Sequence, residues 1–194
     1  LDKFDKEIKD EIKTYLNTLR KKTDEDFIRM YCPNCFESTL IDKSSLKRKK
    51  NKITCHCGSL MKPVDEEFYK NIGVVCDEWY VKTTSLLKKI SDILRSWWRF
   101  GVEISTRPCR ELEIIFDRPS RIRISRDKVY LYLHWFYEED LDRLRIVIDV
   151  VKSLGMKLHV EVDGRRDHCL VEPNKMIEFG FSKDLSMYYH LVVE

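Results

Sequence analysis

Four cysteines in the N-terminal third of the chain stand in two close pairs. Two residues separate Cys32 from Cys35, one residue separates Cys55 from Cys57, and nineteen residues lie between the pairs. Thiolates are soft ligands, and four of them in a tetrahedral arrangement hold Zn²⁺ without leaving a coordination position open. The spacing therefore predicts one Zn²⁺ with a structural role, bound by all four cysteines.

Two other side chains could each complete a different set of four metal ligands. His56 lies inside the second pair and could replace one of its sulfurs, and Cys76 could supply a thiolate from farther along the chain. In either case the module is too small, and too poor in apolar residues, to fold on an apolar core alone. Metal binding would supply its folding energy.

The segment between the cysteine pairs is strongly basic. Residues 31–63 contain seven basic and two acidic residues, while the segments on either side are close to neutral, so the overall formal charge of +3 comes from this region. Exposed cations can neutralise phosphates and release counterions without reading bases. The alternative interpretation is a mobile, solvated hairpin tip. The residues expected to contact nucleic acid are Lys43, Lys47, Arg48, Lys49, Lys50 and Lys52.

Over about residues 30–65 the cysteine pattern resembles a zinc ribbon. The resemblance implies two cysteine knuckles on adjacent hairpin turns that clamp one zinc ion. Independently, two short apolar stretches at residues 39–41 and 52–54, on either side of a polar loop, indicate a small hairpin-like module. The resemblance also implies a place in transcription, replication or translation machinery. The second pair departs from the family pattern, because only one residue separates its cysteines. Its knuckle should therefore be tighter or irregular.

Helical periodicity marks three segments that would position these residues. Residues 2–22 form an amphipathic pattern, residues 85–100 form a second pattern closed by Gly101, and residues 138–154 form a third that begins with three acids and ends at Gly155. Residues 63–77 are the main candidate for a linker.

A period of two replaces the helical pattern after Gly101. It predicts strands at 112–116, 122–124 and 129–135 with turns at 117–119 and 125–128, and further strands at 157–162, 169–172, 176–181 and 187–193. The fold class is α+β: an N-terminal helix and zinc ribbon, followed by a mainly antiparallel sheet packed on one long helix. The expected segments are a helix at 1–30, the zinc ribbon at 31–63, a linker and amphipathic helix at 64–101, and an α+β domain at 102–194.

The predicted sheet offers a second surface for nucleic acid. If the apolar residues face the helix, the opposite face carries arginines and aromatic side chains that can stack on bases. The alternative is that another helix, the Trp97 and Trp98 segment, or a second copy of the chain buries this face. The candidate residues are Arg121, Arg123, Tyr130 and Tyr132, with His134 beside them.

Catalytic patterns are weak by comparison. The chain contains no phosphate-binding glycine loop and no H-E-x-x-H motif. Residues 163–169 gather reactive side chains, but neighbours in sequence are not thereby positioned for catalysis. We therefore predict a non-catalytic zinc-binding protein that contacts DNA or RNA within a nucleoprotein complex. The alternative is a protein-interaction or assembly component, in a larger protein complex or a homo-oligomer, in which zinc only stabilises the fold.

No apolar run approaches the roughly 20 residues of a membrane-spanning helix, and the first residues lack the apolar core of a secretory signal. The sequence therefore predicts a cytoplasmic protein without a membrane partner.

Overall fold

A computed structural model describes residues 2–97, 103–116 and 120–194. The protein has an α+β fold whose larger sheet is mostly antiparallel, as expected. Its chain divides into two compact units, one of residues 12–77 and one that joins residues up to 11 with 78–194. Trp98, Gly101 and the turn expected at 117–119 lie outside the described residues.

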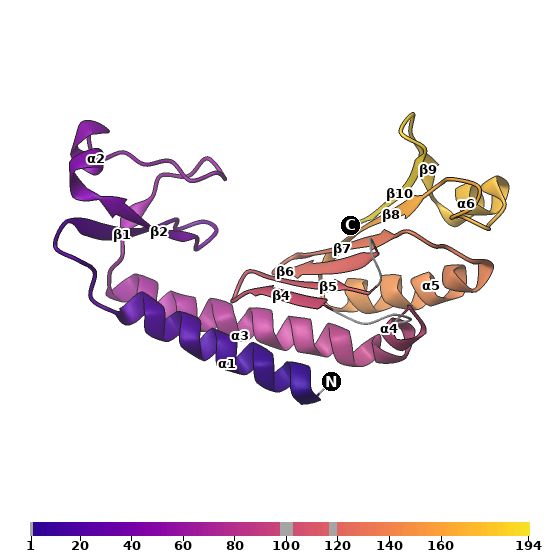
Figure 1. The fold of residues 1–194 in the computed structure, drawn as a ribbon, viewed down its shortest axis with the longest axis horizontal. Coiled ribbons are helices and arrows are strands. Elements are labelled where there is room, and N and C mark those ends of the chain that lie inside the picture. Colours follow the sequence, from indigo (N-terminus) through magenta and orange to yellow (C-terminus); the bar gives the residue numbers. More distant parts are fainter. Residues whose placement is uncertain (1, 98–102, 117–119) are drawn as a thin grey trace. The chain divides into compact units, whose positions relative to one another are not determined.

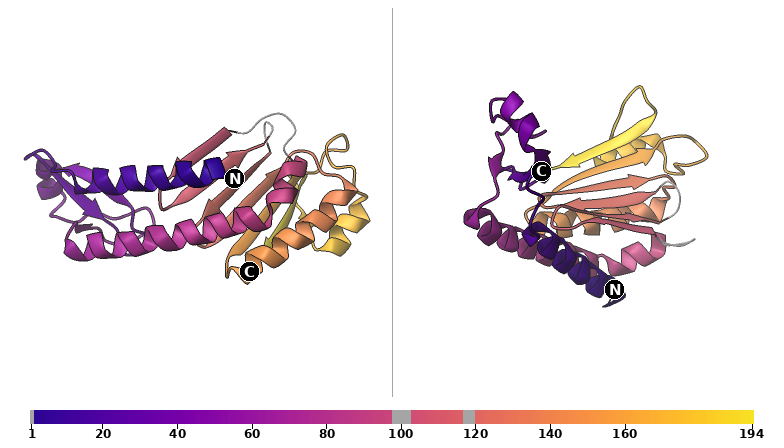
Figure 2. Two further views of the ribbon diagram at one scale, coloured as in Figure 1. Left: turned by 90° about the horizontal axis from the view of Figure 1, so that it is seen from below. Right: turned by 60° about the vertical axis from the view of Figure 1, so that its left-hand side comes forward.

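Two long helices contribute to both units. Helix α1 (Asp2–Arg20) confirms the first amphipathic pattern, and α3 (Glu66–Lys89) is the longest helix in the described part of the chain. Figures 1 and 2 show them side by side, and the hydroxyl of Tyr69 on α3 donates a hydrogen bond to the carbonyl oxygen of Leu19 on α1.

Helix α3 corrects the expected linker at residues 63–77. The first turn is capped by Asp65, whose Oδ1 accepts a hydrogen bond of 2.9 Å from the amide of Phe68. The residues that form the buried stripe of this helical segment are Phe68, Ile72, Cys76 and Trp79. Their spacings of four, four and three are helical, so the periodicity extends upstream of residue 85. The expected helix at 85–100 is instead the end of α3 followed by α4 (Ser91–Trp97).

The unit of residues 12–77 contains a small antiparallel sheet. Strand β1 (Phe27–Tyr31) pairs on one side with β2 (Ser38–Asp42) and on the other with β3 (Lys62–Pro63). The stretch 39–41 is extended as expected. Its partner is β1, which precedes the cysteines, and not the stretch at 52–54.

The other unit contains a seven-stranded sheet in the order β4-β5-β6-β7-β8-β10-β9. Its neighbouring strands are antiparallel except for β7 and β8, which run parallel and are connected by helix α5 (Glu138–Ser153). The strands are β4 (Glu103–Arg107), β5 (Glu111–Ile115), β6 (Arg121–Ser125), β7 (Lys128–Leu133), β8 (Lys157–Asp163), β9 (Ser182–Lys183) and β10 (Tyr188–Val193).

Alternation along these strands separates the two faces of the sheet. On β6 and β7, Ile122, Ile124, Val129 and Leu131 are fully buried, while the residues between them are half-buried. Helix α5 lies along the face with the apolar residues (Figure 2) and buries Leu144 there. The expected packing of the sheet on one long helix is therefore confirmed.

Two strands expected in the C-terminal part were wrong. The segment at 176–181 belongs mostly to helix α6 (Pro173–Phe179), and Cys169 makes only an isolated bridge with Phe136. Pro173 stands at the start of the helix, where its missing amide hydrogen has no cost.

Within the described ranges, no helix is both long enough and apolar enough to cross a membrane.

Candidate metal centre

The first cysteine pair lies in the turn between β1 and β2. The amide of Cys32 donates to the carbonyl oxygen of Glu37 at 2.8 Å, and the amide of Phe36 donates to that of Cys32 at 2.9 Å. Phe36 has a φ of 59°, so the chain reverses through a left-handed residue. The amide of Cys35 points at the sulfur of Cys32 at 3.5 Å. Backbone groups of this turn thus support a sulfur ligand.

The second pair lies in a smaller hairpin turn closed by an isolated bridge between Thr54 and Leu60. The amide of Gly58 donates to the carbonyl oxygen of Cys55 at 2.9 Å, and Gly58 has a φ of 89°. A glycine adopts this conformation without strain, which lets the chain turn with only one residue between the cysteines. The expected tight knuckle is what the structure shows.

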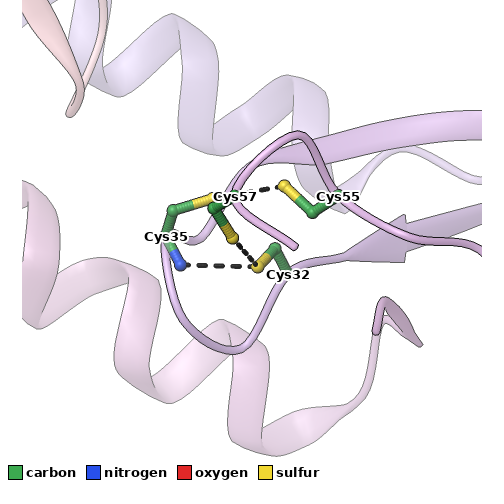
Figure 3. Close-up of side chains that lie close together, drawn as sticks. All are labelled: Cys32, Cys35, Cys55 and Cys57. Atoms are coloured by element: carbon green, nitrogen blue, oxygen red, sulfur yellow. Dashed lines mark hydrogen bonds between the residues drawn. The ribbon is translucent and has the colours of Figure 1, made fainter. Parts of the chain in front are cut away.

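The two turns bring the four sulfurs together (Figure 3). The Cys32 and Cys57 sulfurs lie 3.5 Å apart, as do those of Cys35 and Cys55, so each close contact joins one sulfur from each turn. All four lie within 4.8 Å of one another. Sulfurs bound tetrahedrally to one ion at about 2.3 Å would be about 3.8 Å apart. The group could therefore hold a metal ion, and it is compatible with a site like that of a zinc ribbon.

The environment of the sulfurs differs sharply between neighbours. Hydrogen bonds from the backbone amide and hydroxyl of Ser59, and from Asn34, lower the pKa of the Cys57 thiol to about 5. The backbone hydrogen bond of Cys57 favours the Cys55 thiolate, but burial and the adjacent sulfurs together raise the pKa of Cys55 to about 12. Because four thiolates this close repel one another, a cation among them is needed for all four to ionise.

The two other ligand candidates lie differently. Nδ1 of His56 lies 2.5 Å from Oε2 of Glu37 and 3.5 Å from the Cys55 sulfur. The imidazole thus belongs to a second, overlapping group of possible ligands that includes Cys35, Glu37 and Cys55. Cys76 is buried in α3 and is not among the candidate ligands grouped by the described residues.

A small apolar core includes two of the four cysteines. Cys32 and Cys55 are buried together with Met30 and Met61. The partly buried residues packed against this core are Ile28, Cys35, Ile41, Leu46 and Ile53. The sulfur ligands are therefore part of the packing of this sheet.

Residues 43–52, named the basic segment below, are not the loop that the sequence suggested. Their first part forms helix α2 (Lys43–Arg48), and Asp42 Oδ1 caps it by accepting hydrogen bonds from the amides of Ser44 and Ser45 at 2.6 and 3.2 Å. Leu46 anchors α2 to the cysteine core. The sequence contained this signal, because aspartate followed by a lysine and two serines is a good helix start.

All six basic residues of the segment are exposed. Among the residues that the structure describes, none of the six forms an ion pair. Arg48 donates a hydrogen bond of 3.0 Å to the hydroxyl of Ser45, which is uncharged. Within the described parts of the chain, most of the positive charge of this segment is therefore not neutralised by an acid in contact with it.

The second surface expected to contact nucleic acid lies on the large sheet, and it contains acidic as well as basic side chains. Arg121 faces Tyr132 and Arg123 faces Tyr130 across β6 and β7, so these four residues share one face of the sheet. Glu113 lies 3.2 Å from Arg123 and 3.6 Å from Arg121.

The tyrosines of that face also have partners within the protein. The hydroxyl of Tyr130 donates to Glu161 at 3.0 Å. Trp97 does not cover this face, because its ring packs on Phe116, which is buried on the opposite side. Arg121, Arg123 and Tyr130 are therefore engaged with acids of their own sheet, and the Tyr132 ring lies beside that of Tyr188, with centroids 6.3 Å apart.

The same face holds two groups of possible metal ligands that the sequence analysis did not assemble. One contains His134, Asp163 and His168, and the other contains His159, Glu161 and His190. Alternate positions on β8 indicate that 159, 161 and 163 share a face. The pairing of β8 with β7 and β10, which brings in the remaining histidines, is not a local property of the sequence.

Comparisons with protein-family models, curated proteins and solved structures found no match to this chain.

Proposed function

We propose that this protein binds one Zn²⁺ through Cys32, Cys35, Cys55 and Cys57 and uses the zinc-stabilised module to contact nucleic-acid phosphates. Four sulfur donors with no oxygen ligand suit Zn²⁺ better than Mg²⁺ or Ca²⁺, which take oxygen. A closed set of four ligands makes the ion structural. The metal holds the two turns in place, and the module presents the basic segment.

One observation carries the nucleic-acid part of this proposal. The basic segment is a cluster of exposed cations that form no ion pair with any residue the structure describes, and Leu46 ties it to the core that contains two of the proposed metal ligands. Cations held on an ordered element can neutralise several phosphates at once. Contacts of this kind position a protein on DNA or RNA without reading sequence, which fits a component of a transcription, replication or other nucleoprotein complex.

The test is binding of the zinc-loaded protein to labelled single- and double-stranded DNA and RNA over a salt series, with metal content measured on the same sample. We expect about one zinc per chain and affinity that falls steeply with salt. Replacing Lys47, Arg48, Lys49 and Lys50 with glutamine should reduce the log-log salt slope by about three to four, because each phosphate contact contributes about 0.7 to 0.9.

A matched control removes the same number of charges elsewhere. The exposed residues Lys21, Lys22, Lys88 and Lys89, all replaced with glutamine, should leave the slope nearly unchanged. Equal losses in both variants would mean that only net charge matters. No binding by the wild-type protein at low salt would exclude phosphate contact as the function.

The metal site is tested separately. The Cys57→Ser variant should lose zinc at concentrations of a competing chelator that leave the wild-type protein loaded, whereas His56→Gln should retain it. The opposite order would assign His56 as a ligand.

An interaction with another protein is the second candidate function. The module exposes three large apolar side chains, Phe27, Leu40 and Leu60, at 41%, 48% and 57%. Leu40 lies on β2, an edge strand of the three-stranded sheet. If nucleic acid does not bind, concentration-dependent association that is lost in Leu40→Ser would support this function.

A further inference from the structure

Three potential metal ligands meet where the two parallel strands of the large sheet end. Leu133 of β7 is in register with Val162 of β8, so His134 and Asp163, the next residues on each strand, are neighbours. The carboxyl ends of parallel strands joined by a crossover helix are where side chains and loops form ligand sites in α/β units. His168 reaches the same point from the turn that follows β8.

The distances among these ligand atoms match a single bound ion. Nδ1 of His134 lies 3.4 Å from Asp163 Oδ2, and Nδ1 of His168 lies 3.3 Å from the same oxygen. Nitrogen and oxygen ligands at about 2.0–2.1 Å from a tetrahedral ion are about 3.3–3.4 Å apart. The two imidazole rings have centroids 4.1 Å apart, so both approach the carboxylate together.

Burial and hydrogen bonding distinguish this group from an ordinary surface cluster. Asp163 and His168 are only 2% and 8% exposed. Nδ1 of His168 is buried and has no hydrogen-bond partner in the described part of the chain, although it is close to Asp163. A buried nitrogen of this kind is costly unless a ligand satisfies it.

The turn after Asp163 holds the carboxylate in a fixed orientation. Arg165 donates to Oδ1 from its amide at 3.1 Å and to Oδ2 from Nη2 at 2.6 Å, and its Nε is shared between the two oxygens at 3.1 Å from each. A carboxylate has about four lone-pair sites, so Oδ2 can still accept an ion while Arg165 occupies its other side. Arginine then acts as the outer partner that orients a ligand.

Hydrogen bonds from the backbone hold the chain in place at both histidines. The amide of His134 donates to Ser120 Oγ at 2.8 Å, and the His168 carbonyl oxygen accepts from the amide of Phe136 at 2.9 Å. The exposed carboxylate of Asp167 lies 3.6 Å from Nδ1 of His168, so the group has an acidic approach from the surface. All of these residues belong to the unit that contains the large sheet.

We propose that His134, Asp163 and His168 form a second metal site, separate from the cysteines, which binds a divalent transition-metal ion of the Zn²⁺ or Co²⁺ class. Two imidazoles and one carboxylate suit such ions better than Mg²⁺ or Ca²⁺. Three protein ligands leave at least one coordination position for water, which is typical of catalytic and not of structural zinc sites.

The other histidine cluster on this face is less suitable. Nδ1 of His190 is 3.8 Å from Glu161, and its Nε2 is already paired with Asp184 at 2.8 Å. All three of its members are half-exposed. Water satisfies such groups at little cost, so His190 serves as the control position.

The experiment uses the full chain with one equivalent of Zn²⁺ bound, so that the thiolates, which prefer zinc to cobalt, are occupied. Titration with Co²⁺ should then show a second equivalent bound, with weak visible bands and no sulfur-to-cobalt charge-transfer band. His134→Gln and His168→Gln should each weaken this binding at least a hundredfold. His190→Gln should leave it within about twofold.

The proposal is overturned if the zinc-loaded wild-type protein binds no second equivalent of Co²⁺, or if His190→Gln weakens binding as much as His168→Gln does. The wild-type titration decides the question even where a histidine variant fails to fold. Circular dichroism of each variant without added Co²⁺ identifies such a failure. Cobalt that binds with sulfur charge-transfer bands would reflect the cysteine site and would count against a second site.

Discussion

At the scale of single residues, Gly164 occupies one of the tightest positions in the large sheet unit. A Cβ atom at this position would lie 2.2 Å from the carbonyl oxygen of Met187 and 3.1 Å from the ring of Tyr189. The amide of Gly164 donates to that same carbonyl oxygen at 3.0 Å. The close approach directs the chain from Asp163 into the turn that carries His168, so glycine is required here by space.

The Gly164→Ala variant should therefore destabilise the protein by about 2–3 kcal/mol, because backbone and not a flexible side chain would have to move. Gly73 is the matched control. It lies in α3, and a Cβ there would meet nothing within 4 Å. Gly73→Ala should stabilise the protein by about 0.5–1 kcal/mol, since alanine favours a helix more than glycine does. Denaturant unfolding of both variants measures the two shifts, and a Gly164→Ala protein as stable as wild type would refute the argument.

The candidate sites differ in how far the sequence could predict them. The four cysteines were found because each pair is local and thiolate spacing is informative by itself. The group of His134, Asp163 and His168 was not predicted from the sequence, although residues 163–169 contain several reactive side chains. Its third member lies 29 residues before Asp163. Only the parallel pairing of β7 with β8 brings it close, and pairing over that distance is not written in local periodicity.

At the scale of elements, periodicity predicted most of the helices and strands but failed for α2, α6 and the boundaries of α3 and α4. Helices α1 and α5, and the strands β5 to β8, agree with the periodicity, because each buries one continuous stripe or alternate residues. Helix α6 was mistaken for a strand because seven residues contain too few turns to show a helical period. Helix α2 was not predicted because its basic residues indicated a loop. Its formation depends on the Asp42 cap and on Leu46.

Helix α5 begins at a buried carboxylate that the sequence indicated only as one of three acids. Asp140 is 2% exposed and accepts hydrogen bonds from the amide of Tyr137 at 2.8 Å and from Nε1 of Trp97 at 2.9 Å. Arg143 also donates to it at 2.8 Å. This one side chain therefore caps α5 and fixes the end of α4 to it.

We expect Asp140→Ala to destabilise the protein by about 2–3 kcal/mol, since it removes a cap and leaves buried donors unsatisfied. Asp142→Ala on the same helix is the control. Its carboxylate is 82% exposed and pairs with Arg145 at 2.8 Å, so its loss should cost less than about 1 kcal/mol. Thermal unfolding gives both values. The protein has four tryptophans, and Trp97 is the one that donates to Asp140. A shift in tryptophan emission that occurs only in the Asp140 variant would therefore indicate a change around Trp97. Equal destabilisation by both changes would contradict the assigned role.

At the scale of the whole molecule, the two compact units differ in the apolar core that each contains. The four clustered cysteines lie in the unit of residues 12–77, where the described members buried in the core around them are Met30, Cys32, Cys55 and Met61. The large sheet unit has a continuous buried layer, with Ile122, Ile124, Val129 and Leu131 all at 0% exposure. We expect the small module, which has few buried residues, to depend on a bound metal ion, whereas a sheet with a full apolar layer and a covering helix needs none.

Removing zinc from the cysteines should therefore loosen one unit and spare the other. With a chelator present, amides in β1, β2 and the two cysteine turns should exchange hydrogen at least about a hundredfold faster, because their local stability comes from the metal. Amides in the interior strands β6, β7 and β8 should keep their protection. Hydrogen exchange followed by mass spectrometry, on protein loaded with one equivalent of zinc, measures both regions in one sample.

The Cys55→Ser and Cys57→Ser double variant, examined without chelator, is the control for this experiment. It should reproduce the faster exchange in β1 and β2, because it removes two ligands without exposing the protein to a chelator. Loss of protection throughout β6 to β8 in either case would show that the large sheet unit also depends on the cysteine-bound metal. Unchanged exchange in β1 and β2 would show instead that the apolar core holds the module together without it.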